Sequence, residues 1–359
     1  MITNLCLGNA ATLSERYLFR GLREKGVELT VISHWPTPES GEVENAGFRV
    51  IYLPLLKKID LSAIRKLKAI ISGGNFDILY MTFSKAITNG LIAARGTGVK
   101  TIGYMGSMSL YWHDPFNYLS FVNRRLDRLI CESDSIVEHS LNQFRKRLKG
   151  KLVRIYKGFD PAWTNGVTVK KRSDLNIPEN AMVVGCVANV RRVKGIPYLI
   201  RSAEFLPDDL PIYFLMIGPG MDSSPVSKKI GRTKYRNNFR TVGYTNEVFS
   251  YVSLCDLYIQ PSLSEGFGRS VLEAMALAKP VIVTEVGGAK EQVIPGKNGF
   301  VVPVKSAKAI AEKIHSCWMN RARLTEMGRA SRERIISEFN PGIMVQQNFD
   351  LFRELMNKQ

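Results

Sequence analysis

Short apolar runs alternate with segments of helical periodicity along this chain of 359 residues. Strands are expected where a few mostly apolar residues lie between turn residues, and helices where apolar residues recur every three or four positions. The strands expected in the first half are Leu5–Leu7, Glu28–Ser33, Phe48–Leu53, Ile78–Met81, Thr101–Tyr104, Arg128–Glu132 and Leu152–Tyr156. The helices expected there are Leu13–Lys25, Leu61–Ser72, Ser84–Arg95, Pro115–Asn123 and Ser135–Leu148. This alternation predicts parallel α/β units.

A turn-rich stretch at 157–166 and a polar stretch at 170–174 interrupt the rhythm, which then restarts. The strands expected in the second half are Met182–Ala188, Tyr213–Ile217, Arg240–Val242, Leu257–Gln260 and Pro280–Thr284. The helices expected there are Ile196–Phe205, Asn246–Ser253, Ser270–Leu277, Ala307–Trp318, Arg323–Ser337 and Met344–Met356. A chain of this length is long for one core. The pattern therefore predicts two α/β domains, with ligands bound at the carboxyl ends of their strands.

Two glutamates, Glu265 and Glu273, bracket a glycine-rich turn between an expected strand and an expected helix. Glycines let a ligand approach the backbone, and a helix start attracts phosphate. Carboxylates accept hydrogen bonds from sugar hydroxyls. These features suit a nucleotide sugar. The alternative is that Ser270 and Glu273 form a capping box and that Glu265 is a solvated loop residue.

Other loops after expected strands carry further candidates. The segment 189–195, Asn-Val-Arg-Arg-Val-Lys-Gly, suits a diphosphate, although it could also be a basic surface loop. Gly218 and Gly243–Tyr244 also follow strands and could be ordinary turns. In the first half, His113 and Asp114 follow a strand end.

The stretch 261–276, together with Lys279–Thr284, Gly287–Gly288, Glu291 and Asn298–Pro303, resembles the carboxyl-terminal signature of retaining glycosyltransferase family 4. The likeness is specific over about 183–303 and looser over 78–158. It implies a GT-B fold: two Rossmann-like domains facing a cleft, with the last helix returning to the first domain. The expected boundaries are 1–162 plus about 343–359 for the acceptor domain, and 163–342 for the donor domain.

The resemblance also implies roles for residues. The catalytic group would be Glu265, Lys194, Arg191 and His113. The donor-binding group would be Gly266, Phe267, Gly268, Arg269, Glu273, Asn189, Gly218, Gly243 and Tyr244. The acceptor side would hold Gly8, Asn9 and Asp114. Ala188–Asn189 stands where the family usually has Gly-Arg, so Arg191 is a candidate to replace the missing arginine.

By the same resemblance, a UDP-sugar or GDP-sugar donates a hexosyl-type group, with retention, to a hydroxyl of a glycan or lipid-linked acceptor. Cell-surface polysaccharide or lipopolysaccharide-type synthesis is the expected setting. No aspartate-rich metal motif is present in the sequence, so neither metal nor cofactor is expected. A nucleotide-sugar epimerase and a phosphorylase of similar architecture remain alternatives.

The formal net charge of +18 predicts an anionic partner. A nucleic acid is the alternative from another class, but neither clustered aromatic and basic residues nor a zinc-finger spacing supports it. The five cysteines lack metal or disulfide spacing, which favours a reducing compartment. With no signal-like start and no long apolar run, a cytoplasmic protein is expected.

Basic and apolar residues interleave at helical spacing over Leu55–Ile71. One interpretation is an interfacial segment that binds anionic lipid, so that the protein lies peripherally on the inner face of the membrane. The other is an ordinary amphipathic helix with a solvated basic face.

Overall fold

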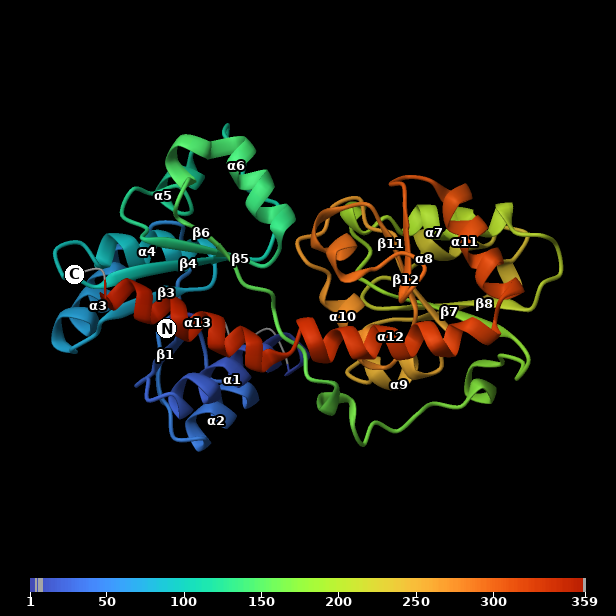
Figure 1. The fold of residues 1–359 in the computed structure, drawn as a ribbon, viewed down its shortest axis with the longest axis horizontal. Coiled ribbons are helices and arrows are strands. Elements are labelled where there is room, and N and C mark those ends of the chain that lie inside the picture. Colours follow the sequence, from blue (N-terminus) through green and yellow to red (C-terminus); the bar gives the residue numbers. More distant parts are fainter. Residues whose placement is uncertain (4, 6–8, 358–359) are drawn as a thin grey trace. The chain divides into compact units, whose positions relative to one another are not determined.

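The computed structural model describes residues 1–3, 5 and 9–357, with side chains from residue 12 onward in the first helix. The chain forms two compact units, shown in Figure 1. Unit 1 contains Met1–Gly158 and Pro341–Gln359, and unit 2 contains Phe159–Asn340. The α/β class and the two Rossmann-like domains expected from the sequence are confirmed.

Parallel strands form the centre of unit 1. They are β1 (Thr30–Ser33), β2 (Arg49–Tyr52), β3 (Ile78–Met81), β4 (Lys100–Met105), β5 (Arg128–Cys131) and β6 (Leu152–Arg154). One sheet has the order β3-β4-β5-β6, and β1 pairs with β2. Ile2 makes parallel bridges to both Ile32 in β1 and Met81 in β3, and so joins the two sets. The first strand was expected at Leu5–Leu7, but the pairing is made by Ile2; Cys6 and Leu7 lie outside the described residues.

Helices cover both faces of this sheet. They are α1 (Asn9–Glu24), α2 (Pro38–Asn45), α3 (Leu61–Gly73), α4 (Ser84–Ala93), α5 (Phe116–Leu119), α6 (Asp134–Leu148) and α13 (Pro341–Asn357). Because side chains alternate along a strand, Leu79 and Met81 pack with α3 and α4, whereas Tyr80 packs with α1 and α13. The return of the last helix to the first domain is therefore confirmed.

Unit 2 holds one parallel sheet of six strands in the order β12-β11-β10-β7-β8-β9. The strands are β7 (Met182–Val187), β8 (Ile212–Ile217), β9 (Phe239–Val242), β10 (Leu257–Gln260), β11 (Val281–Thr284) and β12 (Gly299–Val302). The helices are α7 (Ile196–Ser202), α8 (Ser224–Ile230), α9 (Val248–Ser253), α10 (Arg269–Ala276), α11 (Ala307–Met319) and α12 (Ala322–Glu338). The chain moves outward from β7 to β9 and then restarts on the other side of β7 with β10. The order therefore reverses between β7 and β10.

Two of the described α-helices and one strand were missed by periodicity. In α2, Val43 is the one large apolar residue, and the helix begins with a capping box between Thr37 and Ser40. The seven-residue α8 carries two lysines and a proline, which masked its short apolar face. The strand β12 lies at the edge of the sheet. It falls within Asn298–Pro303, a stretch that we had identified by its resemblance to the family but had not predicted to be a strand.

Candidate functional site

The switch between β7 and β10 places two loops together at the carboxyl edge of the unit 2 sheet. The loop after β7 carries Lys194, and the loop after β10 carries Glu265. Gly195, in the left-handed region with φ +67°, ends the first loop, and a Cβ atom there would lie 1.8 Å from the carbonyl oxygen of Pro261. This close approach requires glycine. In open α/β sheets, ligands bind at such switch points.

Lys194 and Glu265 form an ion pair, with 2.6 Å between Nζ and Oε2. Both side chains are mostly buried, at 18% and 13% exposure. The same carboxylate oxygen accepts a hydrogen bond from the Ser262 hydroxyl at 3.1 Å. Two features hold the Lys194 ammonium group at the strand ends. One is the close approach of Gly195 to Pro261, and the other is the Glu265 carboxylate that Lys194 shares with Ser262.

A chain of buried hydrogen bonds extends from Glu265 into the sheet. Gln260, the last residue of β10, donates to Ser262 at 2.8 Å. Its Oε1 accepts from Tyr258 and from Ser270, each at 3.0 Å. Gln260, Ser262 and Tyr258 are fully buried. Sequence reasoning missed these three residues, although polar side chains in a buried strand were a usable signal, because buried polar groups need partners.

The glycine-rich turn leads into the start of α10. Gly268 precedes the helix with φ +91°, which is favourable for glycine. No side chain caps the helix, and the Ser270 hydroxyl donates instead to Gln260. The capping-box alternative for Ser270 and Glu273 is therefore wrong. Gln292 holds the turn by donating from Nε2 to the carbonyl oxygens of Phe267 and Gly268. The partial positive charge of a helix start faces this turn.

Glu273 lies one turn into α10 and is 7% exposed. Its Oε1 is 3.4 Å from a guanidinium nitrogen of Arg269, which is four residues earlier. Burial raises the pKa of the Glu273 carboxyl, and the positive charge of Arg269 partly opposes that rise. A buried carboxylate with one long contact retains acceptor capacity for a hydroxyl donor.

The other predicted donor residues lie on neighbouring loops of the same edge. Asn189 follows β7, and its side-chain Oδ1 is buried without a hydrogen-bond partner in the described part of unit 2. Arg191 is exposed on that loop. Gly218 follows β8 and donates from its amide to Val242 of β9, which brings Gly243 close. Tyr244 is 75% exposed, and its hydroxyl group contacts Asn246.

The predicted residues of unit 1 are described separately. His113 is exposed in the loop before α5 and stacks on Tyr111, with ring centroids 5.5 Å apart. Asp114 accepts a hydrogen bond from the amide of Phe116 at 3.0 Å. Gly8 lies outside the described residues, and Asn9 is the first residue of α1. Their expected roles stay predictions.

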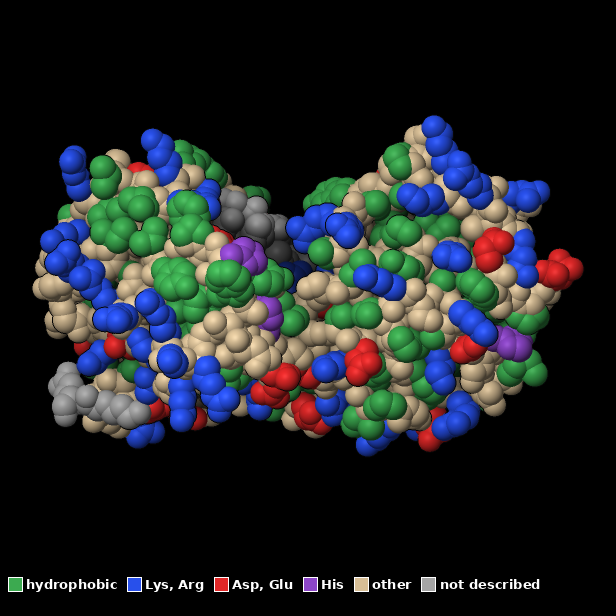
Figure 2. All heavy atoms as spheres, turned by 90° about the horizontal axis from the view of Figure 1, so that it is seen from above, with side chains coloured by type: hydrophobic (Ala, Val, Ile, Leu, Met, Phe, Trp, Pro, Cys, Tyr) green, Lys and Arg blue, Asp and Glu red, His purple; other side chains and the backbone are tan. Residues whose placement is uncertain are grey.

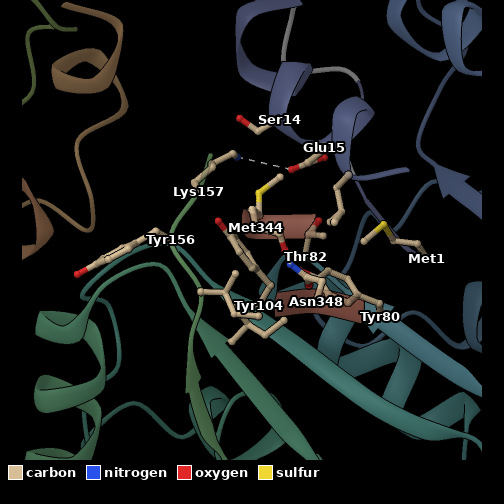
Figure 3. Close-up of a pocket in the computed structure, with 13 residues that line it drawn as sticks. Met1, Ser14, Glu15, Tyr80, Thr82, Tyr104, Tyr156, Lys157, Met344 and Asn348 are labelled. Atoms are coloured by element: carbon tan, nitrogen blue, oxygen red, sulfur yellow. Dashed lines mark hydrogen bonds and ion pairs between the residues drawn. The ribbon is translucent and has the colours of Figure 1, made fainter. Parts of the chain in front are cut away.

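Unit 1 also contains a pocket that sequence reasoning missed. Figure 3 shows it between the sheet and helices α1 and α13, with Thr82, Tyr104 and Asn348 among its walls. Glu15 and Lys157 lie on its rim as an ion pair 3.9 Å apart. Because Thr82 directly follows β3 and Lys157 lies just beyond β6, the pocket is at the carboxyl ends of these strands.

Possible metal ligands do not gather in either unit: within residues 1–3, 5 and 9–357, no group of three or more His, Cys, Asp or Glu side chains could hold an ion. The described cysteines, Cys131, Cys186, Cys255 and Cys317, are buried thiols, and burial raises the pKa of each to about 12. They therefore stay protonated and unreactive at neutral pH.

Comparison with known proteins assigns the family. Residues 168–334 match the family described as glycosyl transferases group 1, and residues 15–163 match glycosyltransferase family 4. The capsular polysaccharide biosynthesis glycosyltransferase CapM of Staphylococcus aureus is 28% identical over 182 residues, which cover 49% of this chain and 47% of CapM. The chain spans about half the length of the curated relatives it matches first.

Two solved structures share the fold over nearly the whole chain. A glycosyltransferase from Rickettsia africae superimposes with a TM-score of 0.84 at 19% identity, covering 100% of this chain and 98% of that one. Anabaena HepE, crystallised with UDP-glucose, gives a TM-score of 0.80 at 19% identity, with coverage of 100% and 98%. The fold is therefore GT-B, as expected. The chain belongs to the group 1 glycosyltransferases of the family 4 type.

Proposed function

We propose that the protein transfers a sugar from a nucleotide diphosphate sugar to an acceptor hydroxyl, with retention of the anomeric configuration and without a metal ion. The observation that carries this proposal is the arrangement at the β7–β10 switch. A mostly buried lysine–glutamate pair lies beside a glycine turn at a helix start, and a buried glutamate follows one turn later. This edge offers positive charge for phosphate and carboxylates for hydroxyl groups.

Each group has a distinct task in this proposal. Lys194 and the start of α10 stabilise the negative charge that develops on the departing diphosphate, and Arg191 adds a second cation. Glu265 accepts hydrogen bonds from the donor sugar, while Glu273 accepts them from the ribose. Gly218, Gly243 and Tyr244 line the side of the base. Because Lys194 is already paired, it needs little reorganisation when the donor binds.

Transfer breaks the bond between the anomeric carbon and the phosphate oxygen, and the electron pair leaves with the diphosphate. The acceptor oxygen forms its bond on the same face of the sugar, and its proton passes to the departing phosphate. Lys194 therefore acts on the leaving group, and no side chain of unit 2 is required to become covalently attached.

The acceptor side belongs to unit 1 in this proposal. The pocket bordered by Glu15 and Lys157 offers both a carboxylate and an ammonium group to a hydroxyl-bearing acceptor. His113 and Asp114 are further candidates for contacts with the acceptor. CapM is a capsular polysaccharide enzyme, which supports a glycan or lipid-linked acceptor in cell-surface polysaccharide synthesis. We propose that the reaction takes place in the cytoplasm.

The test is a reaction with a panel of UDP-sugars and GDP-sugars, in the presence and absence of a chelator. Release of nucleoside diphosphate identifies the donor, and proton NMR of early product reports the anomeric configuration. We expect one donor to be consumed equally with and without chelator, and an axial linkage from an axial donor. Inversion, or complete loss of turnover on chelation, would contradict the retaining, metal-independent reaction.

A further inference from the structure

Exposed positive charge is widespread in this protein and does not by itself mark a site. Figure 2 shows Lys and Arg side chains scattered over both units. In α3, for example, Lys66 is exposed while Leu67 is buried in the core of unit 1, as in an ordinary amphipathic helix. No helix in the described part of the chain is both long and apolar enough to cross a membrane. Lys194 differs from the surface lysines because it is mostly buried and paired with Glu265.

The Glu265 carboxylate in this pair is held through only one of its two oxygens. The Lys194 ammonium group donates to Oε2 at 2.6 Å, and the Ser262 hydroxyl group donates to the same atom at 3.1 Å. Among the hydrogen bonds of the described residues, none reaches Oε1 of Glu265. Each oxygen of an ionised carboxyl group can accept hydrogen bonds. The second oxygen of Glu265 therefore keeps its acceptor capacity for a ligand.

The direction of the hydrogen bond from Ser262 follows from the charge of Glu265. A serine hydroxyl group has one hydrogen, and an ionised carboxylate can only accept. Ser262 therefore gives its hydrogen to Glu265 and must accept from its other neighbour, the side chain of Gln260, at 2.8 Å. Only the amide nitrogen of Gln260 can donate, so Nε2 points to Ser262 and Oε1 points away from it.

The other end of this amide is fixed as an acceptor. Oε1 of Gln260 accepts from the hydroxyl groups of Tyr258 and Ser270, each at 3.0 Å. Burial raises the pKa of Tyr258 well above its ordinary value, so this hydroxyl group keeps its hydrogen at neutral pH. Gln260, Tyr258 and Ser262 are fully buried, and water is therefore not available to replace a lost partner. One amide thus connects Ser262 with Ser270 in the first turn of α10.

We propose that Gln260 is a positioning residue that sets which oxygen of Glu265 faces the donor sugar. Gln260 orients the hydroxyl group of Ser262, Ser262 and Lys194 together hold Oε2, and Oε1 is presented to a sugar hydroxyl group. Hydrogen bonds in such a chain polarise one another and hold a single arrangement when every member has its partner. The inference rests on the proposed sugar transfer and adds to it a residue that acts from inside the sheet, through Ser262.

The test interrupts this chain at two successive links. Gln260→Met removes the amide and keeps a side chain of similar length, whereas Ser262→Ala removes only the hydroxyl group. With the preferred nucleotide sugar, each variant should lower kcat about tenfold, because Glu265 loses a donor that orients it. The double variant should be no slower than the slower single variant, since both changes break the same connection. Ser262→Ala tests the link by itself if Gln260→Met does not fold.

A second measurement separates positioning of Glu265 from general support of the loops. Calorimetric titration of Ser262→Ala with the nucleoside diphosphate alone should give the native affinity, because this ligand lacks the sugar that Oε1 would contact. Ser270→Ala breaks the other arm of the same glutamine and should lower kcat less than Ser262→Ala does. Ser202→Ala is the control for the loss of a buried serine hydroxyl group. Ser202 donates only to the carbonyl oxygen of Leu199 in α7, so its variant should keep the native kcat.

The outcomes distinguish this inference from the proposed function. If the native protein transfers sugar and Ser262→Ala is as active as Ser202→Ala, the role of Gln260 is overturned and the proposed function stands. Equal losses of kcat in Ser262→Ala and Ser270→Ala, additive losses in the double variant, or weaker binding of the nucleoside diphosphate to Ser262→Ala would also overturn the positioning role. A native protein that consumes no nucleotide sugar would overturn both proposals.

Discussion

The two units share an α/β architecture but depart in different ways from the usual pattern of an apolar core and a polar surface. In unit 2, charged groups are buried or mostly buried near the strand ends, where Lys194 pairs with Glu265 and where Glu273 of α10 contacts Arg269. In unit 1, the unusual groups are apolar and exposed, as at Trp112 and Leu61. Largely buried charge at strand ends is typical of a site for a small, charged ligand, whereas exposed large apolar side chains are features of a protein's surface.

The largest expected effect is the loss of Lys194. Lys194→Ala removes the cation placed to meet the departing diphosphate and leaves the mostly buried Glu265 without its ion pair. Turnover should fall about 10²- to 10³-fold. Steady-state kinetics with the preferred donor measures the loss, and Lys228→Ala on the exposed surface of unit 2 is the control. A loss no larger than that of the control would place the leaving group elsewhere.

Glu273→Gln separates a binding role from a structural one. The change removes a charged acceptor proposed for ribose hydroxyls, so donor affinity should fall about 10- to 100-fold, or about 1–3 kcal/mol. Calorimetric titration with the donor measures this difference, with Glu291→Gln as a control outside the predicted ribose contacts. Unchanged affinity in a folded Glu273→Gln protein would leave Glu273 a structural residue.

The raised pKa of Glu273 predicts that the stability of the protein depends on pH, and Glu273→Gln tests this. Burial raises the pKa of Glu273 above its ordinary 4.5, so the folded protein binds this proton more tightly than the unfolded chain does. The contribution of Glu273 to the free energy of unfolding should therefore decrease as pH rises from below 4.5 through the raised pKa. Above that window, Glu273→Gln should be at least as stable as the native protein. Urea unfolding at several pH values tests this, and a variant that is less stable at neutral pH would contradict it.

The smallest effect concerns the two neighbouring arginines. Arg191 and Arg192 are both exposed, and Arg191 is the candidate to replace the arginine that the family usually has where Asn189 stands. Arg191→Ala should raise the KM for the donor about two- to fivefold, as expected for a solvent-screened charge. Arg192→Ala should have less effect. Equal KM values in both variants would mean that Arg191 does not compensate.

Much of this fold could be predicted because its strands are short apolar runs between turn residues. The prediction for β10 gave the observed residues 257–260, and the strand-end loops with Lys194 and Glu265 followed from it. The chain of hydrogen bonds from Gln260 through Ser262 to Glu265 could not be predicted, because it depends on the direction in which side chains of a buried strand and its following turn point. The contact between Lys58 and the ring of Phe116 could not be predicted either, because these residues are distant in sequence and no local period links them.

The most direct measurement of the central claim is a calorimetric titration of the full chain with UDP and with GDP at neutral pH. The central claim is that Lys194 in the loop after β7 and Glu273 in the first turns of α10 bind a nucleoside diphosphate. It predicts that one of the two nucleotides binds the native protein, and that Lys194→Ala and Glu273→Gln each weaken that binding about tenfold or more. Equal affinity in the native protein and both folded variants would contradict the claim, as would a native protein that binds neither nucleotide.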